Sequence, residues 1–383
     1  MRYYIIAGEA SGDLHASNLI KELKKLDSNA EFRAWGGDLM RQQGAALVKH
    51  YRELAFMGFK EVIVNLNTIF KNIRFCKEDI ESFNPDVIIF VDYPGFNMRI
   101  AEWAHKTGYR TVYYISPQVW AWKEGRAKKL KRDIDKMIVI LPFEKEFYKK
   151  YGFEVDYVGH PLLDVISGFE TDFKFRAANG LEGKKIIALL PGSRKQEIAK
   201  KLPIMLSIKT QFPDNTFVIA GAPGVDQEFY KSFTDNGYKT PIVYNKTYDL
   251  LSNAEAALVT SGTATLETAL LGVPEVVCYL GSKFSYEIGK RLVKVPFISL
   301  VNLIMGKMIV KELIQYDLTS EKLSNELKLL LSDNQYRDEM KANYKLLQEK
   351  LGGVGASRRA AEMVNGFLAQ ENLGAQNASE STT

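Results

Sequence analysis

Short, continuous runs of apolar residues recur along the chain, and each ends at a glycine, proline or aspartate. With the turns that follow them, the runs occupy residues 3–12, 86–95, 111–118, 136–143, 184–193, 216–224, 256–263 and 275–281. Strands buried on both faces, as in parallel sheets covered by helices, have such continuous runs, whereas half-exposed strands alternate. The pattern therefore predicts an α/β architecture, formed twice.

Amphipathic segments of helical length separate these runs, for example Leu14 to Leu26 and Lys71 to Phe83. They supply the crossovers that parallel strands require. In open parallel sheets, ligands bind beyond the carboxyl ends of the strands. We therefore expect the chemistry in the turns that follow the apolar runs.

The length of 383 residues predicts two domains, because a single hydrophobic core rarely grows so large. Residues 161–183 lack a strand signal, so we place one lobe at 1–165 and a second at 166–344. The helices of 345–371 are expected to pack back on the first lobe. Residues 372–383 are polar and poor in apolar side chains, which is typical of a disordered tail.

The composition, 46% hydrophobic and 25% charged, is that of a globular protein. A net charge of +5 suits phosphorylated substrates, an anionic membrane surface or nucleic acid, and does not choose among them. Cys76 and Cys278 form no CxxC pair, so a reducing cytoplasm is expected rather than a disulfide or zinc framework. No run approaches the roughly 18 apolar residues of a spanning helix, so any membrane contact is expected to be peripheral.

The first turn carries Gly8, Glu9, Ser11, Gly12 and Asp13 directly after the opening strand. Its glycines let backbone approach a ligand, and Ser11 or Asp13 can cap the following helix, whose N-terminal amides favour anions. An ordinary glycine-bearing turn explains the residues as well, because the G-x-G-x-x-G fingerprint is absent.

Asp92 follows the run of residues 86–91 and precedes Pro94 and Gly95, which fix a turn. A carboxylate at the carboxyl edge of a strand is well placed to accept a proton from a substrate hydroxyl. The alternative is an aspartate that only caps its turn.

Two turns in the second half favour phosphate binding. Gly192, Ser193 and Arg194 combine a glycine turn, a hydroxyl and a guanidinium at a helix start, which is a natural diphosphate cradle. The P-loop pattern is absent. The second turn adds a further hydroxyl, a glycine and a carboxylate that can accept ribose hydroxyls, although a capping box is the alternative. Its residues are Ser261, Gly262, Thr263 and Glu267.

Metal chemistry has little support, because the four histidines show no ligand spacing and Asp133-Ile134-Asp135 precedes a strand instead of ending one. We expect no metal and no cofactor.

Trp120 and Trp122 precede a run of basic residues. This run suits the binding of a sugar phosphate or of anionic headgroups, and the alternative is a solvated helix face. The run contains Lys123, Arg126, Lys128, Lys129, Lys131 and Arg132.

A helical apolar stripe with basic neighbours suggests either a face packed on the core or a membrane contact. Its apolar residues are Val62, Ile63, Leu66, Ile69, Phe70 and Ile73, and its basic neighbours are Lys60, Lys71 and Arg74.

Together these segments resemble the lipid-A-disaccharide synthase family of GT-B glycosyltransferases. The matching segments, in the family's order, are GEASGD, the D-x-P-x-F-N of DYPGFN, SPQVWAW, LPFEKEFY, GHP, LPGSR, TSGTATLE and KRLVKVPFISLVNLIMGKMIVKELIQ. The segments span residues 3 to 320 approximately. Several matching segments together indicate the family far more specifically than any one of them.

The resemblance implies a GT-B fold with two Rossmann-like lobes facing across a cleft. It implies inverting transfer of 2,3-diacylglucosamine from UDP-2,3-diacylglucosamine to 2,3-diacylglucosamine 1-phosphate, which releases UDP and forms a β(1→6) disaccharide phosphate. The donor is expected on the C-terminal lobe and the acceptor on the N-terminal one. The resemblance also implies a peripheral location on the cytoplasmic face of the inner membrane and no nucleic-acid partner, while the oligomeric state stays open.

Residue roles carry over from the family in the same way. Asp92 is the expected catalytic base, Arg194 the donor or leaving-group ligand, and Glu267 the ribose ligand. Asn302 matches an asparagine near the active site, although Leu300-Val301 precedes it here instead of the expected proline, and its role stays open. The residues expected near the diphosphate are Gly192, Ser193, Ser261, Gly262 and Thr263.

Two alternatives remain at this stage. One is another GT-B protein that uses a UDP sugar, such as a peptidoglycan-type transferase or a UDP-sugar epimerase. The other is a non-catalytic nucleotide-sugar-binding or membrane-scaffold protein. Asp92 together with Arg194 argues against the second alternative, because binding alone needs no base.

Overall fold

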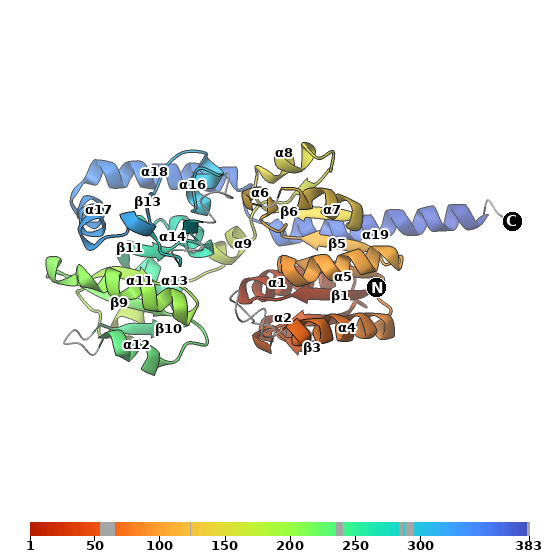
Figure 1. Ribbon diagram of the computed structural model, residues 1–383, viewed down its shortest axis with the longest axis horizontal. Helices are drawn as coiled ribbons and strands as arrows, with labels where there is room; N and C mark the ends of the chain where they lie inside the picture. The colour runs from red at the N-terminus through yellow and green to blue at the C-terminus, as the bar shows by residue number, and fades with distance from the viewer. Residues whose placement is uncertain (54–65, 123, 235–239, 283–285, 288–294, 381–383) are drawn as a thin grey trace. The chain divides into compact units, whose positions relative to one another are not determined.

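The computed structural model describes residues 1–53, 66–122, 124–234, 240–282, 286–287 and 295–380. The chain divides into two compact units (Figure 1). The first unit comprises Met1–Asp164 together with Leu351–Thr383, and the second comprises Val165–Lys350. The division at Asp164 lies one residue from the expected boundary, and the returning segment begins at Leu351 instead of near residue 345.

Seven strands in the described part of the first unit form a parallel sheet in the order β3-β2-β1-β4-β5-β6-β7. They are β1 (Arg2–Ala7), β2 (Glu31–Gly36), β3 (Ala46–His50), β4 (Val87–Val91), β5 (Thr111–Tyr114), β6 (Lys136–Val139) and β7 (Asp156–Tyr157). The strand order reverses between β1 and β4, which are neighbours. The carboxyl ends of this pair are therefore the topological switch point, where open α/β sheets bind ligands.

Helices connect these strands and cover the sheet. They are α1 (Ala10–Leu26), α2 (Asp38–Gln42), α4 (Leu66–Phe83), α5 (Pro94–Lys106), α6 (Val119–Trp122), α7 (Arg126–Asp133), α8 (Glu144–Lys149) and α19 (Ala356–Glu380), with a 3-10 turn η1 at Tyr51–Glu53. All five residues of β4 are buried, which explains why the strand is a continuous apolar run.

The C-terminal helix α19 belongs to the first unit and lies against α1 (Figure 1). The carboxylate of Asp164 accepts hydrogen bonds from the amides of Ala356 (3.3 Å) and Ser357 (2.9 Å), so it caps the first turn of α19. The helix continues to Glu380, so most of the segment expected to be a disordered tail is helical in the structure.

Six strands in the described part of the second unit form another parallel sheet, in the order β10-β9-β8-β11-β12-β13. They are β8 (Lys185–Leu190), β9 (Asn215–Gly221), β10 (Ile242–Tyr244), β11 (Ala254–Thr260), β12 (Glu275–Tyr279) and β13 (Lys311–Ile314). Here the strand order reverses between β8 and β11. The second switch point therefore lies where the turns after Leu190 and Thr260 meet.

The remaining helices pack around this second sheet. They are α10 (Phe175–Ala178), α11 (Lys195–Ser207), α12 (Gln227–Thr234), α13 (Thr247–Ser252), α14 (Thr263–Leu270), α16 (Leu300–Met305), α17 (Ser320–Ser332) and α18 (Asn334–Lys350), with 3-10 turns η2 (Lys209–Gln211) and η3 (Gln315–Asp317). Helix α9 (Leu162–Ser167) crosses the division between the units. Both α11 and α14 begin at the switch point, so the amides of their first turns lie in the same region.

Candidate functional site

Asp92 is held on a left-handed backbone at the switch point of the first sheet. It has φ +45° and Tyr93 has φ +50°, a conformation that side-chain-bearing residues rarely adopt. Each such residue costs of order 1–3 kcal/mol, so the surroundings must enforce it. The carbonyl of Asp92 accepts hydrogen bonds from Asn97 Nδ2 (2.7 Å) and the Tyr113 hydroxyl (2.6 Å). The buried Asn97 also donates to the carbonyls of both neighbouring strands, so it fixes this turn.

The pKa of the Asp92 carboxyl group is raised towards neutrality. Burial, and then the negative charge of Glu9, raise its pKa from 3.8 to about 7, while a backbone hydrogen bond from Tyr93 opposes the shift. A base is most effective when its pKa lies close to the operating pH. Glu9, half-buried at the start of α1, thus acts on Asp92 through its charge.

The two glycines of the first turn serve close packing. A Cβ atom on Gly8 would lie 2.2 Å from Tyr93 Cγ, so only glycine lets the Tyr93 ring cover this turn. A Cβ atom on Gly12 would lie 3.2 Å from the Cβ atom of Ala7, which means that α1 packs tightly on β1. Both glycines therefore help to bring α1 and the Asp92 turn together.

Neither Ser11 nor Asp13 caps α1, contrary to expectation. The N-cap position is Glu9, and Ser11 and Asp13 lie inside the helix. The buried carboxylate of Asp13 instead accepts hydrogen bonds from the amides of Gly37 (2.8 Å), Met40 (3.1 Å) and Leu39 (3.2 Å). Asp13 thus anchors the start of α2, and this contact cannot be predicted from the local sequence.

The switch point of the second sheet contains a pocket of about 370 Å³. All seven residues expected to bind UDP line it: Gly192, Ser193, Arg194, Ser261, Gly262, Thr263 and Glu267. Other lining residues come from the ends of β9 and β11 and from the start of α13. Two turns that lie far apart in the sequence therefore form one concave site.

Hydrogen bonds and glycine conformations shape this pocket. Gly192 has φ +126° and Gly262 has φ +151°, a region that favours glycine. The Thr260 hydroxyl donates to the Pro191 carbonyl (3.0 Å) and joins the two turns. The Ser261 hydroxyl donates to the Ile298 carbonyl (3.0 Å), so it also ties the pocket to the loop before α16.

Arg194 and Glu267 supply opposite charges to the pocket. The half-exposed guanidinium of Arg194 lies 3.3 Å from a carboxylate oxygen of Glu197, one turn along α11. Glu267 accepts a hydrogen bond from the Tyr248 hydroxyl (3.1 Å), and burial raises the pKa of the Glu267 carboxyl. No sequence motif marks Tyr248, because it lies in an ordinary helical segment.

Asn302 is buried outside the pocket lining and has a structural role. Its amide nitrogen donates to the Val310 carbonyl (2.9 Å) and to Glu312 (2.8 Å), and its amide oxygen accepts from the amides of Ile309 and Val310. Glu312 also accepts from Ser299, so this network holds the loop that Ser261 contacts. Asn302 is thus connected to the pocket through the loop.

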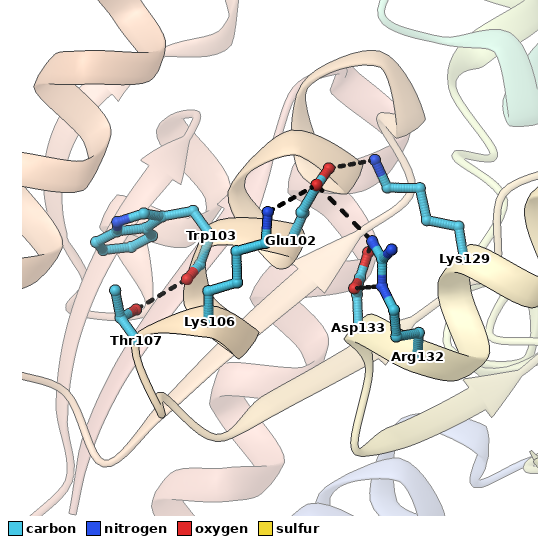
Figure 2. A network of polar contacts seen from close by, with 7 residues as sticks. All are labelled: Glu102, Trp103, Lys106, Thr107, Lys129, Arg132 and Asp133. Atoms are coloured by element: carbon cyan, nitrogen blue, oxygen red, sulfur yellow. Dashed lines mark hydrogen bonds and ion pairs between the residues drawn. The ribbon is translucent and has the colours of Figure 1, made fainter.

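Two residues of the basic run on α7, Lys129 and Arg132, form surface ion pairs (Figure 2). Glu102 on α5 contacts Lys129, Lys106 (3.1 Å) and Arg132 (3.8 Å). Lys129, and to a smaller extent Lys106, lower the pKa of Glu102 to about 2. Trp120 is buried against Phe143 and is not an open stacking surface. Lys123 lies outside the described residues.

The Asp133-Ile134-Asp135 segment is used in packing the first unit. Asp133 accepts from Arg132 Nε (2.6 Å), and Asp135 accepts from the Thr111 amide and hydroxyl (each 2.8 Å). Among the described residues, no group of three or more His, Cys, Asp or Glu side chains is arranged to hold a metal. Within the same residues, no helix is long and apolar enough to cross a bilayer.

The apolar stripe is only partly described. On α4, Ile73 is buried and Phe70 is 59% exposed, so this face is not entirely packed on the core. Lys60, Val62 and Ile63 lie outside the described residues, as does the side chain of Leu66.

A family model described as lipid-A-disaccharide synthetase matches residues 3–365. The chain belongs to this family. It is 39% identical to lipid-A-disaccharide synthase of Geobacter metallireducens, over 97% of this chain and 98% of the relative. It is 38% identical to the Nitrosococcus oceani enzyme of the same name, over 97% of each chain. As a lipid-A-disaccharide synthetase family member it is an enzyme, a glycosyltransferase of lipid A biosynthesis.

Solved structures place the fold of this family member. A UDP-GlcNAc 2-epimerase from Neisseria meningitidis bound to UDP-GlcNAc superimposes with a TM-score of 0.67 at 13% identity, over 95% of this chain and 99% of the other. The glycotransferase of kitacinnamycin gives 0.62 at 15% identity, over 95% and 98%. The predicted α/β class with two Rossmann-like parallel sheets of GT-B type is confirmed.

Proposed function

We propose that the chain transfers 2,3-diacylglucosamine from its UDP derivative to 2,3-diacylglucosamine 1-phosphate, with inversion, giving a β(1→6) disaccharide 1-phosphate and UDP. The supporting observation is a division of chemistry between the two switch points. One carries a carboxyl group with its pKa near neutrality, and the other carries a pocket lined by Arg194 and by the turns that open α11 and α14. Inverting transfer needs one base on the incoming hydroxyl and one set of dipoles and cations on the departing diphosphate.

Asp92 accepts the proton of the acceptor's 6-hydroxyl as the new glycosidic bond forms. Its strained turn and its pKa support this role, because a sugar hydroxyl attacks well only when a positioned group removes its proton. Glu9 contributes by keeping the pKa of Asp92 high.

UDP occupies the pocket of the second unit. Its diphosphate lies against Arg194 and the N-terminal amides of α11 and α14, whose partial positive charge stabilises the leaving group without a metal ion. Glu267, which accepts a hydrogen bond from Tyr248, accepts the ribose hydroxyls.

The enzyme acts at the cytoplasmic face of the inner membrane as a peripheral protein, because its acylated substrates are membrane lipids.

The experiment is to measure UDP release in buffer containing EDTA, with both diacylated substrates and, separately, with acyl-free UDP-N-acetylglucosamine. We expect UDP and disaccharide phosphate in equal amounts from the acylated pair only. Release of UDP from the acyl-free sugar would favour another UDP-sugar transferase or an epimerase that also hydrolyses its UDP sugar. Complete loss of activity in EDTA, restored by Mg²⁺ or Mn²⁺, would contradict a metal-independent leaving-group site.

A further inference from the structure

Lys201 is a charged residue on the buried face of α11. The other buried residues of this helix are Ile198, Leu202 and Met205, which form the usual apolar stripe, and the Lys201 side chain is only 4% exposed. Burying an ammonium group is unfavourable unless it is paired, and here burial lowers the pKa of Lys201. Replacing a buried charge with an apolar residue is often neutral or stabilising, so stability alone does not account for the lysine.

The ammonium group of Lys201 lies directly behind the wall of the donor pocket. It is 4.0 Å from one carboxylate oxygen of Glu197, while the other oxygen of Glu197 is 3.3 Å from Arg194. A Cβ atom on Gly192 would lie 3.6 Å from the Lys201 nitrogen. Gly192, Arg194 and Glu197 all line the pocket. Glu197 and Lys201 lie four residues apart on one face of α11, and Arg194 is the N-cap of this helix.

This arrangement places a carboxylate where a diphosphate is expected to bind. Left alone, Glu197 would repel the diphosphate and retain Arg194 in an ion pair. We infer that Lys201 is a positioning residue for the nucleoside diphosphate: it offsets the charge of Glu197 and holds this carboxylate while Arg194 turns to the phosphates. The inference rests on the proposed function, because it takes UDP as the occupant of the pocket.

The test is calorimetric titration of the full chain with UDP and with uridine, for wild type and for Lys201→Met. Methionine is unbranched and of similar length, so it fills the site without the charge. We expect the UDP Kd to rise about tenfold and the uridine Kd to stay within about twofold, because uridine lacks phosphates. The thermal midpoint should hold or rise, because a buried charge is removed. Lys200→Met, an exposed neighbour on the same helix, should change none of these values.

A rescue experiment separates positioning from simple structural support. Adding Glu197→Gln to Lys201→Met removes the carboxylate that Lys201 neutralises, so the UDP Kd should return to within a few-fold of wild type. An unchanged UDP Kd in Lys201→Met would overturn the inference, as would equal weakening of UDP and uridine without rescue. If wild type itself fails to bind UDP, the proposed donor pocket is wrong and the inference falls with it.

Discussion

Among single residues, Asp92 gives the most direct prediction, because its protonation state determines how the reaction rate depends on pH. A general base works only when deprotonated, and the pKa of Asp92 is raised to about 7. We therefore expect kcat/KM to fall about tenfold per pH unit below this value and to level off above it. Initial rates between about pH 5 and pH 9 check this. A profile that stays flat down to pH 5 would mean that the base has an ordinary carboxylate pKa.

The same raised pKa predicts a signature in stability. A carboxyl group whose pKa is higher in the folded state contributes stability that is present below its unfolded pKa and is lost as the pH rises through about 7. Asparagine does not ionise, so Asp92→Asn avoids this loss. The thermal midpoint of Asp92→Asn should therefore gain on wild type as the pH rises from about 5 to about 8. If the difference in thermal midpoint between the two proteins does not depend on pH, the pKa of the Asp92 carboxyl group is not raised in the folded state.

Arg194 is expected to act on the diphosphate, where charge develops as UDP leaves. Losing such a donor typically lowers the rate by about 10²–10³, so Arg194→Ala should lose that much in kcat. Arg194→Lys should recover only part of the rate, because the planar fork is lost. Lys195→Ala is the matched control, since Lys195 pairs with Asp226 at the surface. Wild-type kcat for Arg194→Ala at saturating donor would remove Arg194 from the site.

The sequence predicted the site residues that come from turns, and it missed those that act across the fold. Gly192, Ser193 and Arg194 could be predicted because their residue types suit phosphate binding and they directly follow an apolar run. They line the pocket. Asp13 bonds to a helix start 24 to 27 residues away, and no local pattern distinguishes that role from helix capping or catalysis.

At the scale of elements, α4 combines an exposed aromatic with basic neighbours. Phe70 is 59% and Phe75 is 45% exposed, and the proposed substrates are membrane lipids. If this face touches the bilayer, Ile69→Ser with Phe70→Ser should weaken binding to anionic liposomes several-fold while the fold persists. Phe173→Ser, which alters an 88% exposed side chain in the second unit, is the control. Unchanged liposome binding in the folded double variant would end the membrane role of α4.

The strands were predictable and their spatial order was not. Continuous apolar runs report burial on both faces, which is why β1, β4, β8 and β11 are evident in the sequence. Whether β4 lies beside β1 depends on contacts between residues more than 80 positions apart, such as Ile5 with Ile89. That order creates the switch points, so the position of the pocket follows from the fold and not from any single segment.

At the scale of the whole molecule, each unit has its own sheet, its own switch point and its own share of the proposed reaction. The C-terminal helix α19 returns to the first unit through the Asp164 cap, so the first unit is assembled from both ends of the chain. The return of these helices was expected, although the charged helices after residue 320 carry no local signal in the sequence that specifies their partner.

The central claim is that Asp92 takes the proton from the acceptor hydroxyl while UDP is held elsewhere. The most direct test is kcat of Asp92→Asn at saturating substrates, measured beside its UDP affinity and its thermal midpoint. Asparagine keeps the shape and removes the basicity, so kcat should fall by about 10²–10⁴ with UDP affinity and folding nearly intact. Turnover within a few-fold of wild type would contradict the account and make Glu9 the next candidate for the base.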